Sequence, residues 1–282
     1  MAGATNGSAG WSPTLAVSTN CYHDYTLEEA LAGIERSGFR GVEIGAVVGW
    51  NEHLTPGASE AELDAFRAAL RRHGLQLISM SGHSDLTTPE GVAQYKRALD
   101  TASALGISIV NTGIGGHEGG GEDVAAFLEN VGAVADYAEA RGVVVALETH
   151  GSGLASGHQG VELIRKIGRP NVRINYDTAN VIFYGDVRPE EDIVEAIPLI
   201  ANVHLKDARG GKGVWDFPAL GEGKTDFARI LRSLHDGGYR GPLSLEIEFQ
   251  GLPWPPLAEV NRSVRASYEH LQGILEQIGS GR

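Results

Sequence analysis

The sequence has little cysteine and little positive charge, and each shortage excludes a class of protein. Cys21 is the single cysteine among 282 residues, so no intramolecular disulfide can form and nothing points to an oxidising compartment. Lys and Arg number 23 against 36 Asp and Glu, which gives a formal net charge of −13. Because nucleic-acid affinity depends largely on basic side chains that replace counterions, we expect no nucleic-acid partner. We expect a cytoplasmic protein.

Long apolar runs are absent as well. No stretch approaches the ~20 apolar residues that cross a bilayer, so we expect no membrane partner. The first ten residues are small, polar and uncharged, without the basic start and apolar run of a signal peptide. We predict a disordered tail over residues 1–12 and one domain over residues 13–282. Two domains would also fit this length, but no Pro-, Ser- or Gly-rich linker divides the pattern.

Short apolar runs alternate with longer amphipathic stretches, and the alternation repeats eight times. The runs that we predict as strands are Thr14–Thr19, Gly41–Ile44, Leu75–Met80, Ser108–Thr112, Val143–Glu148, Val172–Asp177, Ile200–Lys206 and Leu243–Glu248. The predicted helices are Thr26–Ser37, Ser59–His73, Pro89–Leu105, Glu122–Arg141, Gln159–Ile167, Pro189–Ile197, Asp226–Gly237 and Leu257–Ile278. Glycines that suit left-handed helix ends follow five of them: Gly38, Gly74, Gly106, Gly142 and Gly238.

Alternating strands and helices imply a parallel sheet, and eight units are what a closed barrel requires. We therefore predict an α/β fold, a single (β/α)8 TIM barrel. An open, doubly wound sheet is the structural alternative. It is disfavoured because the first strand leads into Asn20-Cys21-Tyr22-His23 and not into a Gly-x-Gly-x-x-Gly turn. The glycine-rich segment Gly113–Gly121 lacks the Lys-Ser/Thr of a P-loop, and we predict that it is a flexible active-site loop.

Ionisable residues interrupt the last four predicted strands near their carboxyl ends. These residues are Glu148, Asp177, His204 and Glu246. An unpaired carboxylate buried in a barrel is costly or changes its pKa, so four such placements need a reason. The carboxyl ends of barrel strands converge at one face. Three carboxylates and an imidazole would suit a divalent ion such as Mn²⁺, Mg²⁺ or Co²⁺, and less exclusively Zn²⁺.

Each of these residues also has a purely structural interpretation. A single Glu at a strand end is commonly solvated or salt-bridged, and a single buried His is commonly a hydrogen-bonded core residue. Repetition of the placement in four consecutive strands favours the metal site. Glu248, two residues after Glu246, fits a supporting or a surface charge equally well, and we assign it no direct role.

Several motifs, in this order and at these intervals, resemble those of the xylose isomerase-like sugar isomerase and epimerase superfamily. Its members include inosose dehydratases, hydroxypyruvate isomerases and ketose 3-epimerases. The motifs are Gly41-Val42-Glu43-Ile44, Leu147-Glu148-Thr149-His150, Tyr176-Asp177-Thr178-Ala179-Asn180, His204-Leu205-Lys206-Asp207, Leu220-Gly221-Glu222-Gly223 and Glu246. The resemblance implies a TIM barrel in which Glu148, Asp177, His204 and Glu246 bind the metal, with Mn²⁺ as the expected ion.

The resemblance also implies what the site does. Glu148 and Glu246 would face the substrate from opposite sides as an acid/base pair that moves protons through an enediolate. We also predict seven residues that contact the substrate: His83, Asn111, His150, Asn180, Lys206, Arg209 and Trp215. Trp50, His53 and Phe217 lie in predicted loops of the same face. Arg209 and Lys212 could hold a substrate oxygen or a phosphate.

The sequence differs from two branches of the superfamily at positions near the predicted site, and these differences limit which reaction we expect. Endonucleases of the superfamily carry extra histidines after strands four and six, where this chain has Asn111 and Asn180. Ketose 3-epimerases place a histidine soon after the strand-six aspartate, where Asn180 again stands. We expect a metal-dependent isomerase or epimerase of a small sugar, keto-sugar or cyclitol ketone. The alternatives are a dehydratase or lyase acting by elimination on a keto-sugar or keto-glycoside, and a sugar-binding barrel without catalysis. The final helix, Leu257–Ile278, could close the barrel or contact another copy in a homo-oligomer.

Overall fold

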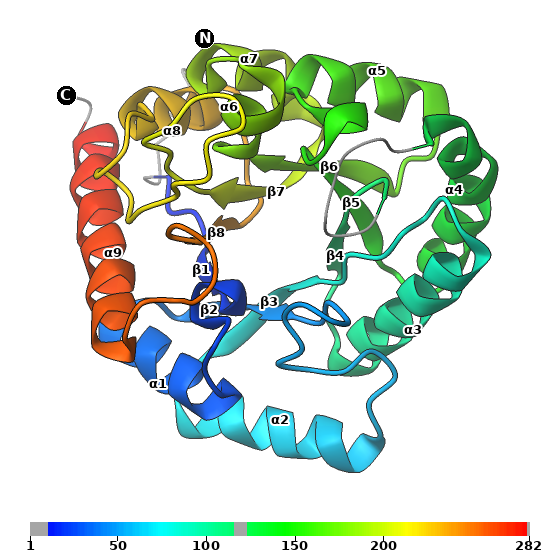
Figure 1. Cartoon of the computed structure of the whole chain (residues 1–282), viewed down its shortest axis with the longest axis horizontal. Coiled ribbons are helices and arrows are strands. Elements are labelled where there is room, and N and C mark those ends of the chain that lie inside the picture. Colours follow the sequence, from blue (N-terminus) through cyan, green and yellow to red (C-terminus); the bar gives the residue numbers. More distant parts are fainter. Residues whose placement is uncertain (1–10, 116–122, 281–282) are drawn as a thin grey trace, which may run out of the picture.

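The structure is a computed structural model that describes residues 11–115 and 123–280 (Figure 1). The predicted tail over residues 1–12 falls outside these ranges up to residue 10, and the predicted loop Gly113–Gly121 falls outside them from residue 116. The described chain begins with Trp11, whose indole N–H donates to the carbonyl of Tyr239 at 3.0 Å. The tail and loop assignments remain predictions.

Eight parallel strands form a closed barrel in chain order (Figure 1). They are β1 (Leu15–Ser18), β2 (Gly41–Gly45), β3 (Gln76–Ser81), β4 (Ile109–Thr112), β5 (Val144–Glu148), β6 (Val172–Asp177), β7 (Ile200–Leu205) and β8 (Leu243–Leu245). The barrel closes where β1 pairs with β8, with Leu15 opposite Leu243. This confirms the predicted (β/α)8 TIM barrel and excludes the open sheet, which would have two edge strands.

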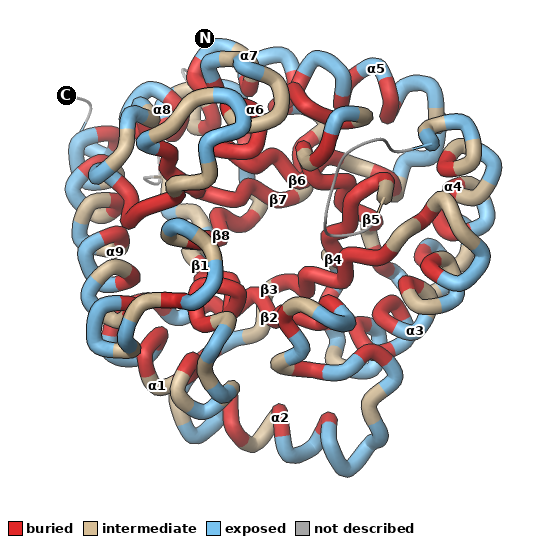
Figure 2. The backbone as a smooth tube through the Cα atoms, viewed as in Figure 1, coloured by how far each residue is buried: buried red, intermediate tan, exposed pale blue. Residues whose placement is uncertain are grey.

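The α-helices form a ring around the barrel (Figure 1). They are α1 (Leu27–Ser37), α2 (Glu60–Arg72), α3 (Pro89–Leu105), α4 (Val124–Glu139), α5 (Gly157–Ile167), α6 (Asn180–Gly185), α7 (Pro189–Ala196), α8 (Phe227–Asp236) and α9 (Leu257–Gly279). Short 3-10 turns cover Thr19–Tyr22, Ser152–Leu154 and Ile197–Leu199. Figure 2 shows buried residues on the strands and on the inward sides of the helices, and exposed residues on their outer sides. None of the described helices combines the length and apolar content needed to cross a membrane.

Capping residues and glycines determine where several of the helices begin and end. Thr26 and Glu29 exchange side-chain and backbone hydrogen bonds in a capping box at the start of α1, which satisfies N–H groups that have no partner within the helix. The five glycines that we predicted at helix ends all have positive φ, from 61° at Gly74 to 105° at Gly38. These predictions are confirmed.

Two elements differ from the prediction. Helix α6, Asn180–Gly185, was not expected, because six residues are too few to show a helical period. Strand β8 ends at Leu245, three residues before the predicted end at Glu248. The segment after β8 is nevertheless buried through Glu248, so its polar side chains stay inside the barrel without a strand ladder.

The loop that follows β7 is organised by the buried side chain of Asp207. Its Oδ1 accepts hydrogen bonds from the backbone N–H groups of Ala208 at 2.8 Å and Thr225 at 3.1 Å. Its Oδ2 accepts from those of Gly221 at 3.0 Å and Gly223 at 2.8 Å. A Cβ on residue 223 would overlap Asp207 Oδ1, which explains the glycine there. Asp207 and the two glycines, which belong to the motifs noted above, therefore have a structural function in this loop.

We predict that Asp207→Ala lowers the free energy of unfolding by about 2 kcal/mol or more, because four N–H groups lose a charged acceptor. Urea unfolding followed by circular dichroism measures the change. Asp236→Ala serves as the matched control, since the Asp236 side chain is 67% exposed and pairs with the adjacent His235. Equal losses in the two variants would contradict the role given to Asp207.

Candidate functional site

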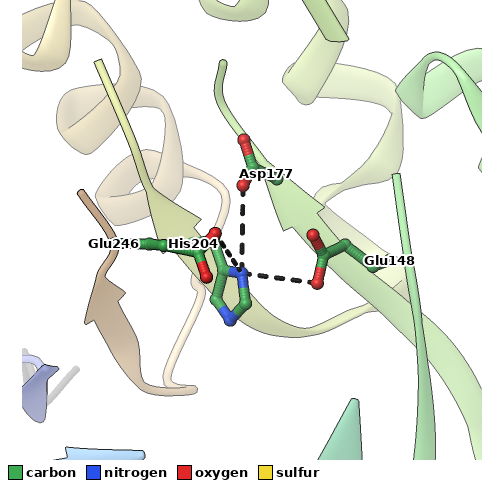
Figure 3. Close-up of side chains that lie close together, drawn as sticks. All are labelled: Glu148, Asp177, His204 and Glu246. Atoms are coloured by element: carbon green, nitrogen blue, oxygen red, sulfur yellow. Dashed lines mark ion pairs between the residues drawn. The ribbon is translucent and has the colours of Figure 1, made fainter. Parts of the chain in front are cut away.

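Four strands deliver one ionisable side chain each to the same end of the barrel. Glu148 and Asp177 are the last residues of β5 and β6, His204 is the penultimate residue of β7, and Glu246 directly follows β8. Strand register brings them together, since Asp177 lies opposite His204 in the β6/β7 pair. Figure 3 shows the three carboxylates turned toward one nitrogen of the His204 ring.

The spacing of the four side chains suits a single ion. His204 Nδ1 lies 3.4 Å from Glu148 Oε2, 3.9 Å from Asp177 Oδ2 and 3.5 Å from Glu246 Oε2. One ligand atom from each residue falls within 4.8 Å of all the others. Ligands about 2.1 Å from an octahedral ion are roughly 3 to 4 Å apart. The four residues can therefore converge on one divalent ion with small movements.

Asp177 offers the clearest sign of an ion among the described residues. Its Oδ1 accepts hydrogen bonds from the backbone N–H groups of Ala179 at 2.8 Å and Asn180 at 2.7 Å, at the start of α6. Its Oδ2 is buried and has no hydrogen-bond partner. A buried, unsatisfied carboxylate oxygen is costly, and a cation facing it removes that cost. The short helix thus fixes the carboxylate with one oxygen aimed at the centre.

The local charge balance also favours a bound cation. Five buried carboxylates surround the centre: Glu43, Glu148, Asp177, Glu246 and Glu248. Among the described residues, their buried cationic partners are Lys206 and, when protonated, His83 and His204. Buried charges need compensation in the low-dielectric interior. A divalent ion would supply two of the missing positive charges, so the donor set fits the metal that the sequence implies.

Burial and neighbouring charges shift the pKa values of the carboxyl groups in opposite directions. Burial alone would raise the pKa of Glu148, but His204 and His83 outweigh it and hold the pKa at about 2. The pKa of Glu246 is also well below its usual range, because Lys206 and His204 outweigh burial. Burial raises the pKa of Asp177 well above normal, against the effect of Lys206. Glu148 and Glu246 are therefore ionised at neutral pH, as carboxylate ligands of a metal must be.

A cavity opens directly above Glu148 and Glu246. Its lining comprises Asn20, Gly45, Val47, Trp50, Asn51, Ser81, His83, Glu148, His150, Asn180, Phe183, Tyr184, Lys206, Trp215, Phe217, Glu246 and Glu248. The empty volume is about 510 Å³, which includes space open to solvent. Carboxylates, amides and imidazoles line one part, and aromatic rings line another.

The polar wall is organised around the buried ammonium group of Lys206. Its Nζ lies 2.5 Å from Glu248 Oε2 and 3.3 Å from Glu246 Oε2. Asn20 Nδ2 donates to both glutamates, at 2.9 Å to Glu248 Oε1 and 3.2 Å to Glu246 Oε1. The Phe217 ring covers the ammonium, with its centroid 4.5 Å from Nζ. Glu246 is thereby held by two partners, Lys206 and Asn20, and its Oε2 also lies 3.5 Å from His204 Nδ1.

The opposite wall is formed around Glu148. His83 Nε2 lies 3.0 Å from Glu148 Oε2, and Asn175 Nδ2 donates to the same oxygen at 2.9 Å. Asn180 Nδ2 donates to Oε1 at 3.0 Å. His150 lies beside this group, with Nε2 3.0 Å from the hydroxyl oxygen of Tyr184. Glu148 is therefore held by three side chains on this wall, His83, Asn175 and Asn180.

Five of the seven expected substrate contacts line this cavity: His83, His150, Asn180, Lys206 and Trp215. Asn111 does not line it, because its amide is buried against Glu43 and His204. Arg209 lines a different surface pocket and pairs with Asp216 at 3.3 Å and Glu222 at 2.5 Å. Those ion pairs hold the guanidinium within the segment that follows β7. Trp50 and Phe217 line the cavity, whereas His53 is bonded to the carbonyl of Tyr25.

Four residues around the centre received no role from the sequence: Asn20, Glu43, Asn175 and Glu248. Glu43 carried a usable signal, since a glutamate within the apolar strand Gly41–Gly45 needs a buried partner. Glu248 shared the predicted strand face of Glu246, and it is 4% exposed and ion-paired in the cavity. Asn20 and Asn175 carried no such signal, because neutral amides are common in loops and strands.

Comparisons with known proteins agree with the fold. The family model described as a xylose isomerase-like TIM barrel matches residues 31–272. The chain is 24% identical to an inosose dehydratase of Clostridium botulinum (strain Alaska E43 / Type E3), over 79% of this chain and 82% of that protein. It is 27% identical to a ketose 3-epimerase of Arthrobacter globiformis, over 71% of this chain and 73% of that protein. A solved xylose isomerase domain protein from Planctomyces limnophilus superposes with a TM-score of 0.75 and 24% identity, covering 96% and 99% of the two chains.

We predict that Mn²⁺ raises the melting temperature of the protein by several degrees and that Asp177→Asn removes most of this rise. An ion at 100 times its Kd stabilises the folded state by about 2.7 kcal/mol. The asparagine oxygen can still cap α6, so the variant loses the ligand charge while the cap remains. Differential scanning fluorimetry with and without Mn²⁺ measures both effects. Asp236→Asn, on the surface, should respond like the unmodified protein, and an unchanged response in Asp177→Asn would refute the site.

Proposed function

The chain belongs to the xylose isomerase-like TIM barrel family, and on that premise we propose that it is a divalent-metal-dependent isomerase or epimerase. Its substrate would be a small sugar, keto-sugar or cyclitol ketone. The observation that carries the proposal is that two of the four converging side chains, Glu148 and Glu246, also line the open cavity. The same carboxylates can therefore reach both an ion and a ligand.

The metal would be held by Glu148, Asp177, His204 and Glu246. We favour Mn²⁺, because three carboxylates and one imidazole form a set of mostly oxygen ligands, and Mg²⁺, Co²⁺ and Zn²⁺ are the alternatives. When bound, such an ion stabilises negative charge that develops on substrate oxygens next to the carbon that loses a proton.

Glu148 and Glu246 are the proposed acid/base pair. Both carboxylates have lowered pKa values, so each is ionised and able to accept a proton from a carbon next to a carbonyl. Asn180 holds Glu148 on one wall, and Asn20 with Lys206 holds Glu246 on the other. Return of the proton to the neighbouring carbon gives isomerisation. Return to the opposite face of the same carbon by the second glutamate gives epimerisation.

The electrostatics of the cavity favour an uncharged substrate. Three carboxylates line it, Glu148, Glu246 and Glu248, against one ammonium group, Lys206. That ammonium already pairs with two of the carboxylates. No arginine is among the described lining residues, and Arg209, the sequence-based phosphate candidate, faces another pocket. A phosphate group placed away from the metal would meet like charges, and the described lining residues offer it no arginine and only a lysine that is already ion-paired, which disfavours binding.

A dehydratase is the second candidate, because one relative is an inosose dehydratase. Elimination shares the first step, removal of a proton next to a carbonyl, but it also needs an acid that protonates the departing hydroxyl group. Lys206 provides an ammonium group at the cavity wall. The reaction type therefore depends on whether a substrate places a β-hydroxyl beside that ammonium group.

We predict that Glu246→Gln lowers the rate of proton exchange at the substrate carbon by about 100-fold or more, because a positioned base is lost without a change in volume. The assay incubates Mn²⁺-loaded protein with candidate ketoses and cyclitol ketones in D₂O and follows deuterium by NMR. Glu222→Gln is the matched control, since Glu222 is 53% exposed and pairs with Arg209 outside the cavity.

The same assay separates the candidates. An isomerase or epimerase incorporates deuterium into recovered substrate and product, whereas a dehydratase yields an unsaturated product. Near-normal exchange in Glu246→Gln would contradict the acid/base assignment. A ligand that binds without any exchange would favour the sugar-binding barrel.

We also predict that a terminal phosphate weakens binding by at least about tenfold, which corresponds to roughly 1.4 kcal/mol of charge repulsion. Calorimetry on the Mn²⁺-loaded protein compares a ketose with its phosphate ester at equal ionic strength. Tighter binding of the phosphate ester would show that the cavity contains an anion site.

A further inference from the structure

We propose that Glu43 is a positioning residue that determines which nitrogen of His204 faces the metal centre. The inference rests on the proposed metal site and extends it to a side chain on the far side of the His204 ring. Glu43 lies in the middle of β2, is fully buried and does not line the cavity. Its carboxylate therefore acts on His204 and not on a substrate.

The two nitrogens of the His204 ring have different surroundings. Nε2 lies 2.7 Å from Glu43 Oε1. Nδ1 lies 3.4 to 3.9 Å from oxygens of Glu148, Asp177 and Glu246. A neutral imidazole carries its hydrogen on one nitrogen and a lone pair on the other. The carboxylate at Nε2 favours the hydrogen there, which leaves the lone pair of Nδ1 directed at the three ligand oxygens.

The other oxygen of Glu43 is held by three neutral donors. Ser79 Oγ donates to Oε2 at 2.6 Å, Asn111 Nδ2 at 2.8 Å and Asn202 Nδ2 at 3.1 Å. These donors come from β3, β4 and β7, so the carboxylate cannot rotate away from His204 without breaking several hydrogen bonds. With its second oxygen occupied in this way, the first is dedicated to Nε2.

The cost of burying this carboxylate supports a functional reason for it. A charged group in a dry barrel interior is rarely better for stability than an apolar residue of the same size. A carboxylate hydrogen-bonded to a metal-binding histidine, however, fixes the ring and strengthens it as a ligand, and loss of such partners typically costs 10- to 100-fold in metal affinity. The same reasoning explains why His204 binds through Nδ1.

Glu43→Gln tests the inference, because it removes the charge with almost no change in volume. We expect Mn²⁺ affinity, measured by competition with a fluorescent chelator, to fall about 10- to 100-fold. Ser79→Ala is the matched control: it removes one hydrogen bond from the same carboxylate and leaves the Nε2 contact in place. We expect its Mn²⁺ affinity to stay within about threefold of the unmodified protein by the same reasoning.

A spectroscopic measurement separates positioning from a merely structural role. In ¹H–¹⁵N spectra of the histidine side chains, we expect a downfield, exchange-protected hydrogen on His204 Nε2 in metal-free and Cd²⁺-loaded protein. We expect this signal to shift or disappear in Glu43→Gln and to persist in Ser79→Ala.

The spectra of the unmodified protein alone can overturn the inference. A hydrogen on Nδ1 of the Cd²⁺-loaded protein, or ¹¹³Cd coupling to Nε2, would do so even if Glu43→Gln fails to fold. Unchanged Mn²⁺ affinity and spectra in a folded Glu43→Gln variant would do so as well. An Nε2 hydrogen that depends on Glu43, together with absence of deuterium exchange into any substrate, would support the inference while counting against the proposed isomerase activity.

Discussion

The concentration of five buried carboxylates at one end of the barrel is the constraint on which the rest of the site depends. Such a cluster survives only if every oxygen has a donor or a cation. Lys206 and Asn20 donate to Glu246 and Glu248, and a backbone N–H group at the start of α6 donates to one oxygen of Asp177. Asp177 Oδ2, which faces His204, has no hydrogen-bond donor among the described residues. The arrangement therefore implies a cation at the centre more strongly than any single ligand does.

The interior of this barrel is polar, so the hydrophobic stabilisation of the fold must come from another part of the structure. TIM-barrel interiors are usually filled by layers of branched apolar side chains, yet here Glu43, Asn111, Asn175 and Asn202 are buried and hydrogen-bonded to one another or to His204. The hydrophobic contribution must then come mainly from packing between the outward faces of the strands and the surrounding helices. Figure 2 shows this buried layer on the inner sides of the helices. Because this outer layer stabilises the fold, the interior of the barrel can carry polar and ionisable side chains.

The sequence predicts those features that are local or repeated. Eight alternations of a short apolar run with an amphipathic stretch predicted the barrel. Ionisable residues near the ends of the last four strands predicted the site of Glu148, Asp177, His204 and Glu246, because the carboxyl ends of barrel strands converge at one face. Features that depend on contacts between distant segments were missed. Arg209 follows a strand of the site, but ion pairs within its own loop decide its direction. Glu43 precedes its partner His204 by 161 residues, and only the closed barrel brings them together.

Asn180 shows how one substitution relative to ketose 3-epimerases, noted from the sequence, acquires a physical meaning. Its backbone N–H caps Asp177 Oδ1 and its side-chain amide donates to Glu148 Oε1, so a single residue orients one ligand and one proposed base. The Lys206 ammonium lies 3.5 Å from its Oδ1, which links this wall to the wall that holds Glu246. A short neutral amide can make both side-chain contacts because it offers a donor and an acceptor at one distance from the backbone. Position 180 therefore links the wall that holds Glu148 to the wall that holds Glu246.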